Sequence, residues 1–305
     1  MIGGEDVGGT VAAALRRRLP DKSWADVRRL CATGKVMIDD ARVLDPAHRL
    51  RAGQRIAINM TAPKPVDAPA GFRIVLEDAH IVIIDKPSGI SSVPYDRKET
   101  GTAMDLVRAA WRRTGKRATV TPLYIVHRID KDTSGLLCFA KTRLAERALH
   151  VVFQRHQASR AYLAVAEGAV DAMRIESRLV PDRGDGIRGS TRRPGEGQNA
   201  ITHVEPLRRL RGSTLCRVHL ETGRTHQIRI HLSERGHPLV GETVYIRDLL
   251  RAGGKPLPAP RLLLHAARLG FSHPVTGVPI DLASPPPPDF VSVFESLGGS
   301  RGDLQ

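Results

Sequence analysis

From residue 74 onward, short apolar runs rich in β-branched residues recur along the chain, and most of them follow one another without a helical pattern between them. The strand-like runs lie at 74–76, 81–84, 123–126, 136–140, 161–166, 215–220 and 226–232. In the same region, helical periodicity appears at 102–114 and 143–155. A doubly wound parallel sheet would need a crossover helix between most successive strands. The pattern therefore predicts an α+β fold with a mixed, largely antiparallel sheet and flanking helices.

A smaller module precedes this region. Amphipathic helical spacing at 11–19 and a second helix that begins at Ser23 are followed by two short strand-like runs, 35–38 and 55–58. The stretch 62–71 is rich in proline and has no periodicity, which is typical of a semi-rigid extended linker. We therefore expect a small α+β module at 1–61, a linker at 62–71, a main domain at 72–292 and a flexible tail at 293–305.

The charge balance indicates a polyanionic partner. The chain carries 47 Lys and Arg against 32 Asp and Glu, a formal net charge of +15, and only 4% aromatic residues. An electropositive surface with few aromatic stacking platforms favours recognition of nucleic acid through charge and shape. The three cysteines are isolated, and no apolar run approaches the length of a membrane span. We expect a soluble, cytoplasmic monomer without a membrane partner.

A polar cluster lies between two apolar strands, at residues 127–135. Such a loop at the end of a sheet can direct side chains into a pocket. Asp130 and Asp132 could form a carboxylate pair there, but the residues alone favour a turn held by Asp, Thr, Ser and Gly. Both readings stay open on composition and spacing.

Ordered motifs across most of the chain resemble the RluA-type pseudouridine synthases. The central motif comprises His127, Arg128, Ile129, Asp130, Thr133, Ser134, Gly135, Leu136 and Leu137, with isoleucine at 129 where leucine is usual. Further matches lie at 74–78, 85–89, 160–164, 220–232, 236–241 and 263–266, in the family's order. The resemblance implies an isomerase that converts uridine to pseudouridine in structured RNA, with ribosomal RNA expected before transfer RNA.

The same resemblance implies roles for individual residues. Asp130 takes the role of catalytic carboxylate and Tyr162 that of the active-site tyrosine. A partly desolvated aspartate needs a nearby cation to stay ionised. Arg229, expected on a strand at 226–232, is the favoured ion-pair partner, with Arg224 as the alternative. The carboxylate could attack the anomeric carbon or help remove the 2′ proton, and the sequence does not choose between these routes.

Substrate contacts follow from the need to flip the uridine out of its stack. Arg128 is expected to occupy the vacated position, because its planar guanidinium stacks well on bases. Tyr162 is expected to stack on the uracil. His127, Arg224 and Thr133 complete the expected substrate-binding set. The Gly- and Arg-rich segment 183–200 is expected to be a mobile surface loop that could touch RNA.

The N-terminal module resembles the αL RNA-binding module. The resemblance implies phosphate contacts from Arg28, Arg29 and Lys35, although these residues taken alone favour a solvated helix face. Such a module would supply affinity and orientation to the main domain.

No cofactor or metal is expected. His219, His226, His231 and His237 lie near one another in sequence, but their spacing makes poor ligand geometry, and structural histidines are favoured. No phosphate-binding loop of the P-loop type is present. Besides Ile129, three features depart from the family pattern: Arg160 stands where lysine is usual, Glu242 stands where aspartate is usual, and the segment 93–95 is a variant of the usual one. The alternatives are an inactive RNA-binding assembly factor and a two-carboxylate glycosidase, for which Asp132 would be the second acid.

Overall fold

The computed structural model describes residues 1–305 except 40, 63–70, 97–98, 114–120 and 305. The chain divides into two compact units, one formed by residues 1–68 with 105–120 and the other by residues 69–104 with 121–305. Helix α3 (Ala103–Arg113) spans this division. Most of the predicted linker at 62–71 lies outside the described residues.

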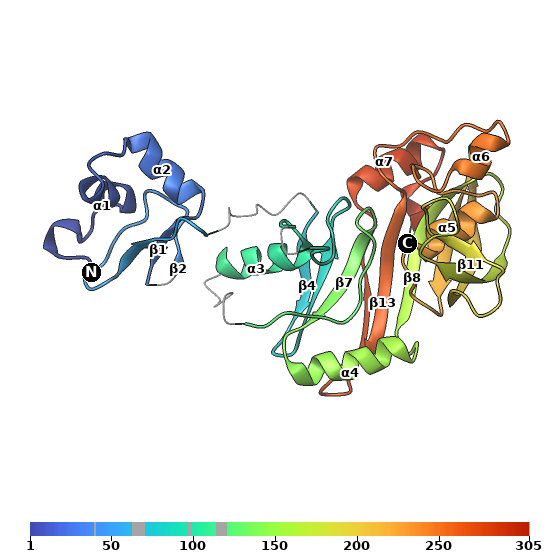
Figure 1. Ribbon diagram of the computed structural model, residues 1–305, viewed down its shortest axis with the longest axis horizontal. Coiled ribbons are helices and arrows are strands. Elements are labelled where there is room, and N and C mark those ends of the chain that lie inside the picture. The colour runs from blue at the N-terminus through green and yellow to red at the C-terminus, as the bar shows by residue number, and fades with distance from the viewer. Residues whose placement is uncertain (40, 63–70, 97–98, 114–120, 305) are drawn as a thin grey trace. The chain divides into compact units, whose positions relative to one another are not determined.

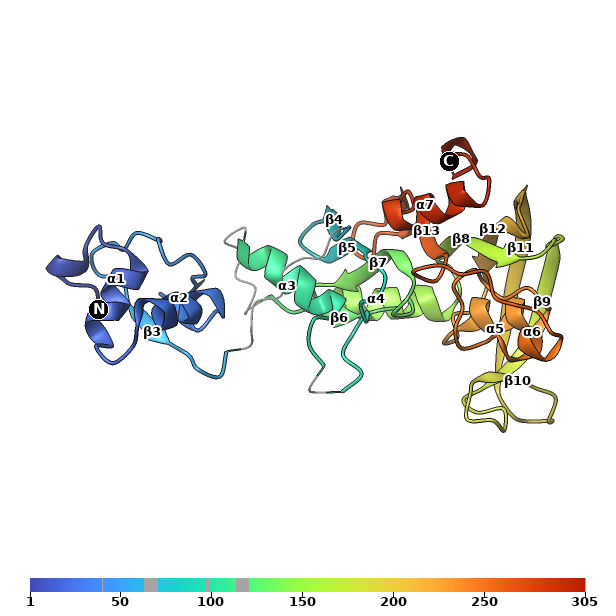
Figure 2. The same ribbon diagram turned by 90° about the horizontal axis from the view of Figure 1, so that it is seen from above.

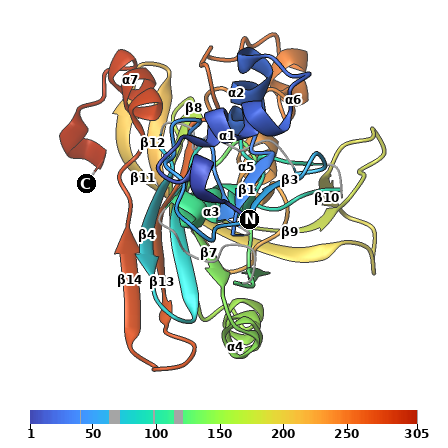
Figure 3. The same ribbon diagram turned by 90° about the vertical axis from the view of Figure 1, so that its left-hand side faces the viewer.

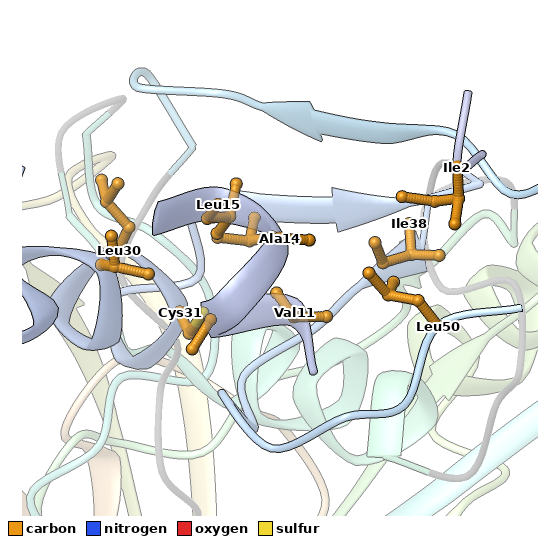
Figure 4. Close-up of a cluster of buried hydrophobic side chains, with 11 residues drawn as sticks. Ile2, Val11, Ala14, Leu15, Leu30, Cys31, Ile38 and Leu50 are labelled. Atoms are coloured by element: carbon orange, nitrogen blue, oxygen red, sulfur yellow. The ribbon is translucent and has the colours of Figure 1, made fainter. Parts of the chain in front are cut away.

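The first unit combines two helices with a three-stranded antiparallel sheet in the order β2-β1-β3. Its elements are η1 (Gly4–Asp6), α1 (Val11–Arg18), α2 (Trp24–Ala32), β1 (Val36–Ile38), β2 (Ala41–Arg42) and β3 (Ile56–Ile58). The Thr10 side chain caps α1, and Ser23 with Asp26 forms a capping box on α2. Figure 4 shows the buried cluster of this unit, in which Leu15 and Cys31 lie with Ile38 of β1.

The second unit is built on one 11-stranded sheet in the order β10-β9-β11-β12-β8-β13-β7-β5-β4, with β14 paired to β13 and β6 to β7. The strands are β4 (Arg73–Glu77), β5 (Ile81–Lys86), β6 (Tyr124–Ile125), β7 (Ser134–Ala140), β8 (Ser159–Glu167), β9 (Met173–Val180), β10 (Gly189–Thr191), β11 (Gln198–Leu210), β12 (Ser213–Leu220), β13 (Leu264–Ser272) and β14 (Pro279–Ala283). Of the pairings in the described sheet, that of β13 with β7 is parallel and the others are antiparallel. The prediction of an α+β fold with a mixed, largely antiparallel sheet is confirmed. Figure 1 shows β7, β13 and β8 side by side at its centre.

Helices cover both faces of this sheet. They are α4 (Arg143–Gln154), α5 (Gln227–Glu234), α6 (Arg247–Arg251), α7 (Pro288–Ser296) and the short η2 (Arg301–Leu304). Leu163 and Val165 of β8 pack with Phe290 and Phe294 of α7 in one buried cluster. Figures 2 and 3 show α5 and α6 on the other side of the sheet from α7. Because side chains alternate along a strand, Arg160 and Tyr162 of β8 are directed away from the α7 cluster.

The prediction of a strand at 226–232 is wrong, because α5 occupies Gln227–Glu234. Apolar and polar residues alternate here, which imitates the period of a half-buried strand. All residues from 227 to 233 are buried, the polar ones included. Gln227 hydrogen-bonds to Thr222 and Thr202, and His231 to Thr202. A helix that is buried all round gives no amphipathic signal in the sequence.

Two other segments carry more structure than the sequence suggested. The expected tail at 293–305 begins inside α7, where Phe294 is fully buried, and Leu297 and Leu304 pack against the same cluster. The segment 183–200, expected to be a loop, contains β10 and the start of β11. These strands pair with β9, so backbone pairing orders part of a stretch that lacks an apolar pattern.

Candidate active site

The polar segment 127–133 connects β6 to β7 and is fixed by backbone contacts. The Ser92 hydroxyl donates to the Ile129 carbonyl at 2.6 Å and accepts from the Ile129 amide at 3.2 Å. Ser88 Oγ donates to the Asp132 carbonyl at 2.7 Å. The turn itself is closed by the Thr133 amide, which donates to the Asp130 carbonyl at 3.1 Å. The backbone of the loop is therefore positioned independently of the Asp130 side chain.

Gly135 determines how closely the exit of this loop approaches β13. Its φ is +112°, and a Cβ atom there would lie 2.3 Å from the Ala266 carbonyl oxygen. Only glycine tolerates both the conformation and the contact. The parallel pairing of β7 with β13, which joins Gly135 to Ala266, depends on this close approach.

A small cavity of about 40 Å³ brings most of the predicted site residues together. Its wall includes Asp130, Thr133, Tyr162, Arg128 and Arg224, together with Arg160 and Gly223. The Tyr162 side chain is buried, and burial raises the pKa of its phenol. Thr133 is 1% exposed, and its hydroxyl has no hydrogen-bond partner among the residues that the structure describes. An unsatisfied hydroxyl in a cavity wall is available to a ligand.

Arg229 is near the cavity but does not make the predicted close ion pair with Asp130. Its Nε and Nη2 atoms each donate to a Glu242 oxygen at 2.7 Å, and both side chains are almost completely buried. Its Nη1 lies 3.9 Å from Oδ2 of Asp132. Burial alone would lower the pKa of Arg229. Its hydrogen bonds to Glu242, together with the negative charges of Asp130 and Asp132, outweigh burial and raise that pKa above its usual value. Arg229 is therefore a fixed buried cation that acts on Asp130 through its field.

A second buried cation, Lys86, belongs to the same site, and the sequence analysis did not single it out. It is 0% exposed, and its Nζ donates to the carbonyls of Pro87, Ile90 and Lys131 at 2.6 to 3.0 Å. Burial lowers its pKa to about 7, against the opposing field of the Asp130 carboxylate. The available signal was a lysine two residues after the apolar run 81–84, where a side chain at the end of a buried strand can be enclosed.

His127 does not line the cavity that contains Asp130. Its Nε2 accepts a hydrogen bond from the Cys138 amide at 2.9 Å, and its ring stacks on Phe153 with 4.3 Å between centroids. Burial lowers its pKa to about 3, so the imidazole is neutral. It lines a neighbouring groove instead, together with Arg128 and Arg160. His127 therefore stabilises β7 through the Cys138 amide, whether or not it also contacts a substrate.

The three candidate RNA-binding residues of the first unit, Arg28, Arg29 and Lys35, differ in their ion pairs and hydrogen bonds. Arg29 forms an ion pair with Asp26 at 2.8 Å, and Lys35 Nζ donates to the carbonyls of Met60, at 2.7 Å, and Ala62. Arg28 donates through Nε to the Trp24 carbonyl at 3.2 Å, which leaves its terminal nitrogens for other partners. Trp24 is half exposed. Within this unit, Arg28 beside Trp24 is thus better suited to meet a ligand than Lys35.

Three of the four histidines considered as metal ligands have hydrogen-bond partners in the protein. His226 Nδ1 lies 2.7 Å from the Tyr245 hydroxyl, and His237 Nδ1 lies 2.9 Å from the Glu167 carbonyl. His231 contacts Thr202 and Ser177. Among the residues that the structure describes, no group of three or more His, Cys, Asp or Glu side chains is arranged to hold a metal ion.

Three histidines with lowered pKa values should make the fold sensitive to acid. Burial lowers the pKa of His231 and of His265 to about 4 each, and that of His127 to about 3. The unfolded chain binds these protons near pH 6.5, so their contribution is complete above that pH and is lost as pH falls toward about 4. Between about pH 7 and about pH 5, each should cost roughly 2 kcal/mol of unfolding free energy. Urea unfolding at both pH values measures this.

The matched variant for this prediction is His231→Asn, which removes one titrating group. Its unfolding free energy should change less between the two pH values than that of the wild-type protein. An unfolding free energy that stays constant over this range would contradict the assignment of neutral, buried imidazoles.

Comparison with known proteins agrees with this arrangement. The family model described as RNA pseudouridylate synthase matches residues 80–234. Ribosomal large subunit pseudouridine synthase D of Zymomonas mobilis is 33% identical over 96% of this chain and 95% of its own. The protein of the same name from Escherichia coli is 31% identical over 96% and 90%. Within the described residues, no helix is both long enough and apolar enough to cross a membrane.

Solved structures show the same fold. Human RNA pseudouridylate synthase domain containing 1 superposes with a TM-score of 0.58 and 20% identity, over 79% of this chain and 98% of its own. Human RNA pseudouridylate synthase domain containing 4 gives a TM-score of 0.56 and 23% identity, over 74% and 92%. With the family model and the full-length relatives, these matches establish that the chain belongs to the RNA pseudouridine synthases of the RluA type, a family of isomerases.

Proposed function

We propose that this enzyme isomerises specific uridines of large-subunit ribosomal RNA, with Asp130 as the catalytic carboxylate. The observation that carries the proposal is the single cavity that contains Asp130, Tyr162, Thr133 and Arg128. The choice of RNA rests on the similar proteins from Zymomonas mobilis and Escherichia coli, which are both named large-subunit pseudouridine synthases. The net charge of +15 suits a polyanionic substrate.

The reaction needs no redox step. The bond between uracil N1 and ribose C1′ breaks, the base turns, and a bond forms between C5 and C1′. The proton on C5 leaves, and N1 gains one, so the product is an isomer of the substrate. The Asp130 carboxylate either attacks C1′ to give a covalent adduct or helps remove the 2′ proton to give a glycal. Arg229 and Lys86 are basic groups near enough to the Asp130 carboxylate for its negative charge to act on both of them.

Binding requires that the uridine leave its stack. Arg128 is exposed at the cavity and donates to the Thr225 hydroxyl, so its guanidinium is held where it can occupy the vacated position. The free Thr133 hydroxyl can hydrogen-bond to the uracil edge. Arg224 and His127 lie toward the adjoining groove and would contact the flanking RNA. The N-terminal module would add phosphate contacts, with Arg28 as the best placed of its three candidates.

Mapping tests the proposal directly. Pseudouridine is mapped in large-subunit ribosomal RNA from cells with and without the gene, and in an unmodified transcript incubated with purified protein. Conversion of a defined uridine in both experiments supports the proposal. Conversion confined to transfer RNA would overturn the choice of substrate, and RNA binding without conversion would favour the assembly-factor alternative.

Tyr162 provides a graded test of base stacking. Tyr162→Phe keeps the ring and should retain most activity, whereas Tyr162→Leu removes the ring face that shields the uracil. We expect the leucine variant to lose about 10²-fold in kcat/KM, an effect at the scale of one catalytic contact. Single-turnover conversion of the mapped uridine measures both. A phenylalanine variant as inactive as the leucine variant would show that the hydroxyl, and not stacking, is what the reaction needs.

A further inference from the structure

Arg160 has an unusual environment for a half-buried cation. It lies on β8, two residues before Tyr162, and its Nε is buried without a hydrogen-bond partner. In the described part of the chain, its guanidinium is also without a carboxylate at ion-pair distance. Its Cζ lies 6.0 Å from the centre of the Phe153 ring, and its Nη1 lies close to Gly223. A cation that is partly desolvated and unpaired is costly unless a ligand completes its bonding.

Arg160 stands between two hollows of the surface. It lines the small cavity that contains Asp130, and it also lines the adjoining groove of about 510 Å³. Arg128, Arg224 and Gly223 line both hollows as well, so the two are continuous. Arg128 and Arg224 are bonded to neutral groups, the Thr225 hydroxyl and the Asn199 carbonyl. Three guanidinium groups thus meet here, and no carboxylate of the described residues forms an ion pair with any of them.

Gly223 makes room for the Arg160 guanidinium. A Cβ atom at this position would lie 2.6 Å from Nη1 of Arg160. Because the clash is with the end of a flexible side chain, an alanine would shift the guanidinium and leave the backbone in place. The glycine is therefore needed for the position of Arg160.

We propose that Arg160, with Arg224, binds the RNA phosphodiester that adjoins the flipped uridine. This rests on the proposed function of the cavity. A uridine seated beside Asp130 remains linked to its neighbours, and its backbone must leave through the continuous groove. A guanidinium suits a phosphate because its planar donors match two oxygens at once. The competing role for Arg160 is packing against Phe153, which would contribute no charge to RNA binding.

Salt dependence separates the two roles. The dissociation constant of a large-subunit ribosomal RNA transcript is measured over a range of KCl concentrations for wild type, Arg160→Met, Arg160→Lys and Arg301→Met. Arg160→Met should weaken binding about tenfold and reduce the slope of log Kd against log salt by about 0.7 to 0.9, as expected for one phosphate contact. Arg160→Lys keeps the charge and should retain the wild-type slope. Arg301, 79% exposed in a surface pair, is the control.

Gly223→Ala provides a second test, because it moves the guanidinium without removing its charge. It should weaken binding of the transcript as Arg160→Met does, whereas a purely long-range effect of charge would leave binding unchanged. A wild-type slope for Arg160→Met, with its fold intact by urea unfolding, would overturn the phosphate assignment. Binding is measured independently of pseudouridine formation. An enzyme that converts no uridine would refute the proposed function and leave the result on Arg160 standing.

Discussion

Asp130→Asn is expected to reduce pseudouridine formation by at least about 10³-fold, since the amide can neither attack C1′ nor accept a proton. The loop should keep its conformation, because Ser88, Ser92 and Lys86 hold its backbone and the Asp130 side chain forms no hydrogen bond to the described residues. The loss should therefore appear in the rate of conversion at saturating enzyme and not in the unfolding free energy. Release of tritium from RNA labelled at uridine C5 measures the rate, because this proton leaves in every turnover.

Asp132→Asn is the matched control for this prediction. Asp132 lies two residues further along the same loop, its side chain is 51% exposed, and it is 3.9 Å from Arg229. It does not line the cavity that contains Asp130. We expect it to retain activity within about tenfold of wild type, as for loss of a peripheral charge. An inactive Asp132→Asn beside an active Asp130→Asn would reassign the catalytic carboxylate to Asp132.

The sequence predicted the scaffold of the site better than its internal contacts. Short apolar runs without crossover helices indicated a mixed sheet, and the sheet has that form. A polar loop between two such runs indicated that Asp130 lies in the connection that leads into β7. Both inferences depend on local periodicity, which a single sequence carries. The residues that converge from β8 and from the segment 220–228 came from matching ordered motifs, because no local rule relates positions so far apart.

The contacts of buried polar groups could not be predicted in this way. The partner of Arg229 is Glu242, 13 residues away, and the polar face of α5 is buried against Thr202 and Thr222. The sequence shows these residues as ordinary polar ones, because burial is a property of the finished packing. His127 is a similar case, since its support of the Cys138 amide needs a β7 strand already in place.

Glu242 illustrates how a departure from the family pattern acquires a physical meaning. Its carboxylate bonds twice to Arg229 and also accepts the amides of Thr243 and Val244 at 3.0 and 2.9 Å. Burial alone would raise its pKa, but the bonds from Arg229 and these amides hold that pKa below its usual range. The pair is therefore ionised at neutral pH and fixes the cation that faces the Asp130 and Asp132 loop.

Glu242→Ala should be the most destabilising single change in the site. It leaves the Arg229 charge buried without its partner, which costs about 3 to 5 kcal/mol of unfolding free energy. Asp281→Ala is the control, because it breaks a solvent-exposed pair with Arg268 and should leave the unfolding free energy nearly unchanged. Urea unfolding measures both.

The double variant Glu242→Leu with Arg229→Met removes both charges and should recover much of the stability. Conversion of uridine should stay impaired, because Asp130 has lost a neighbouring cation. If Glu242→Ala were as mild as Asp281→Ala, the buried pair would not be what holds Arg229.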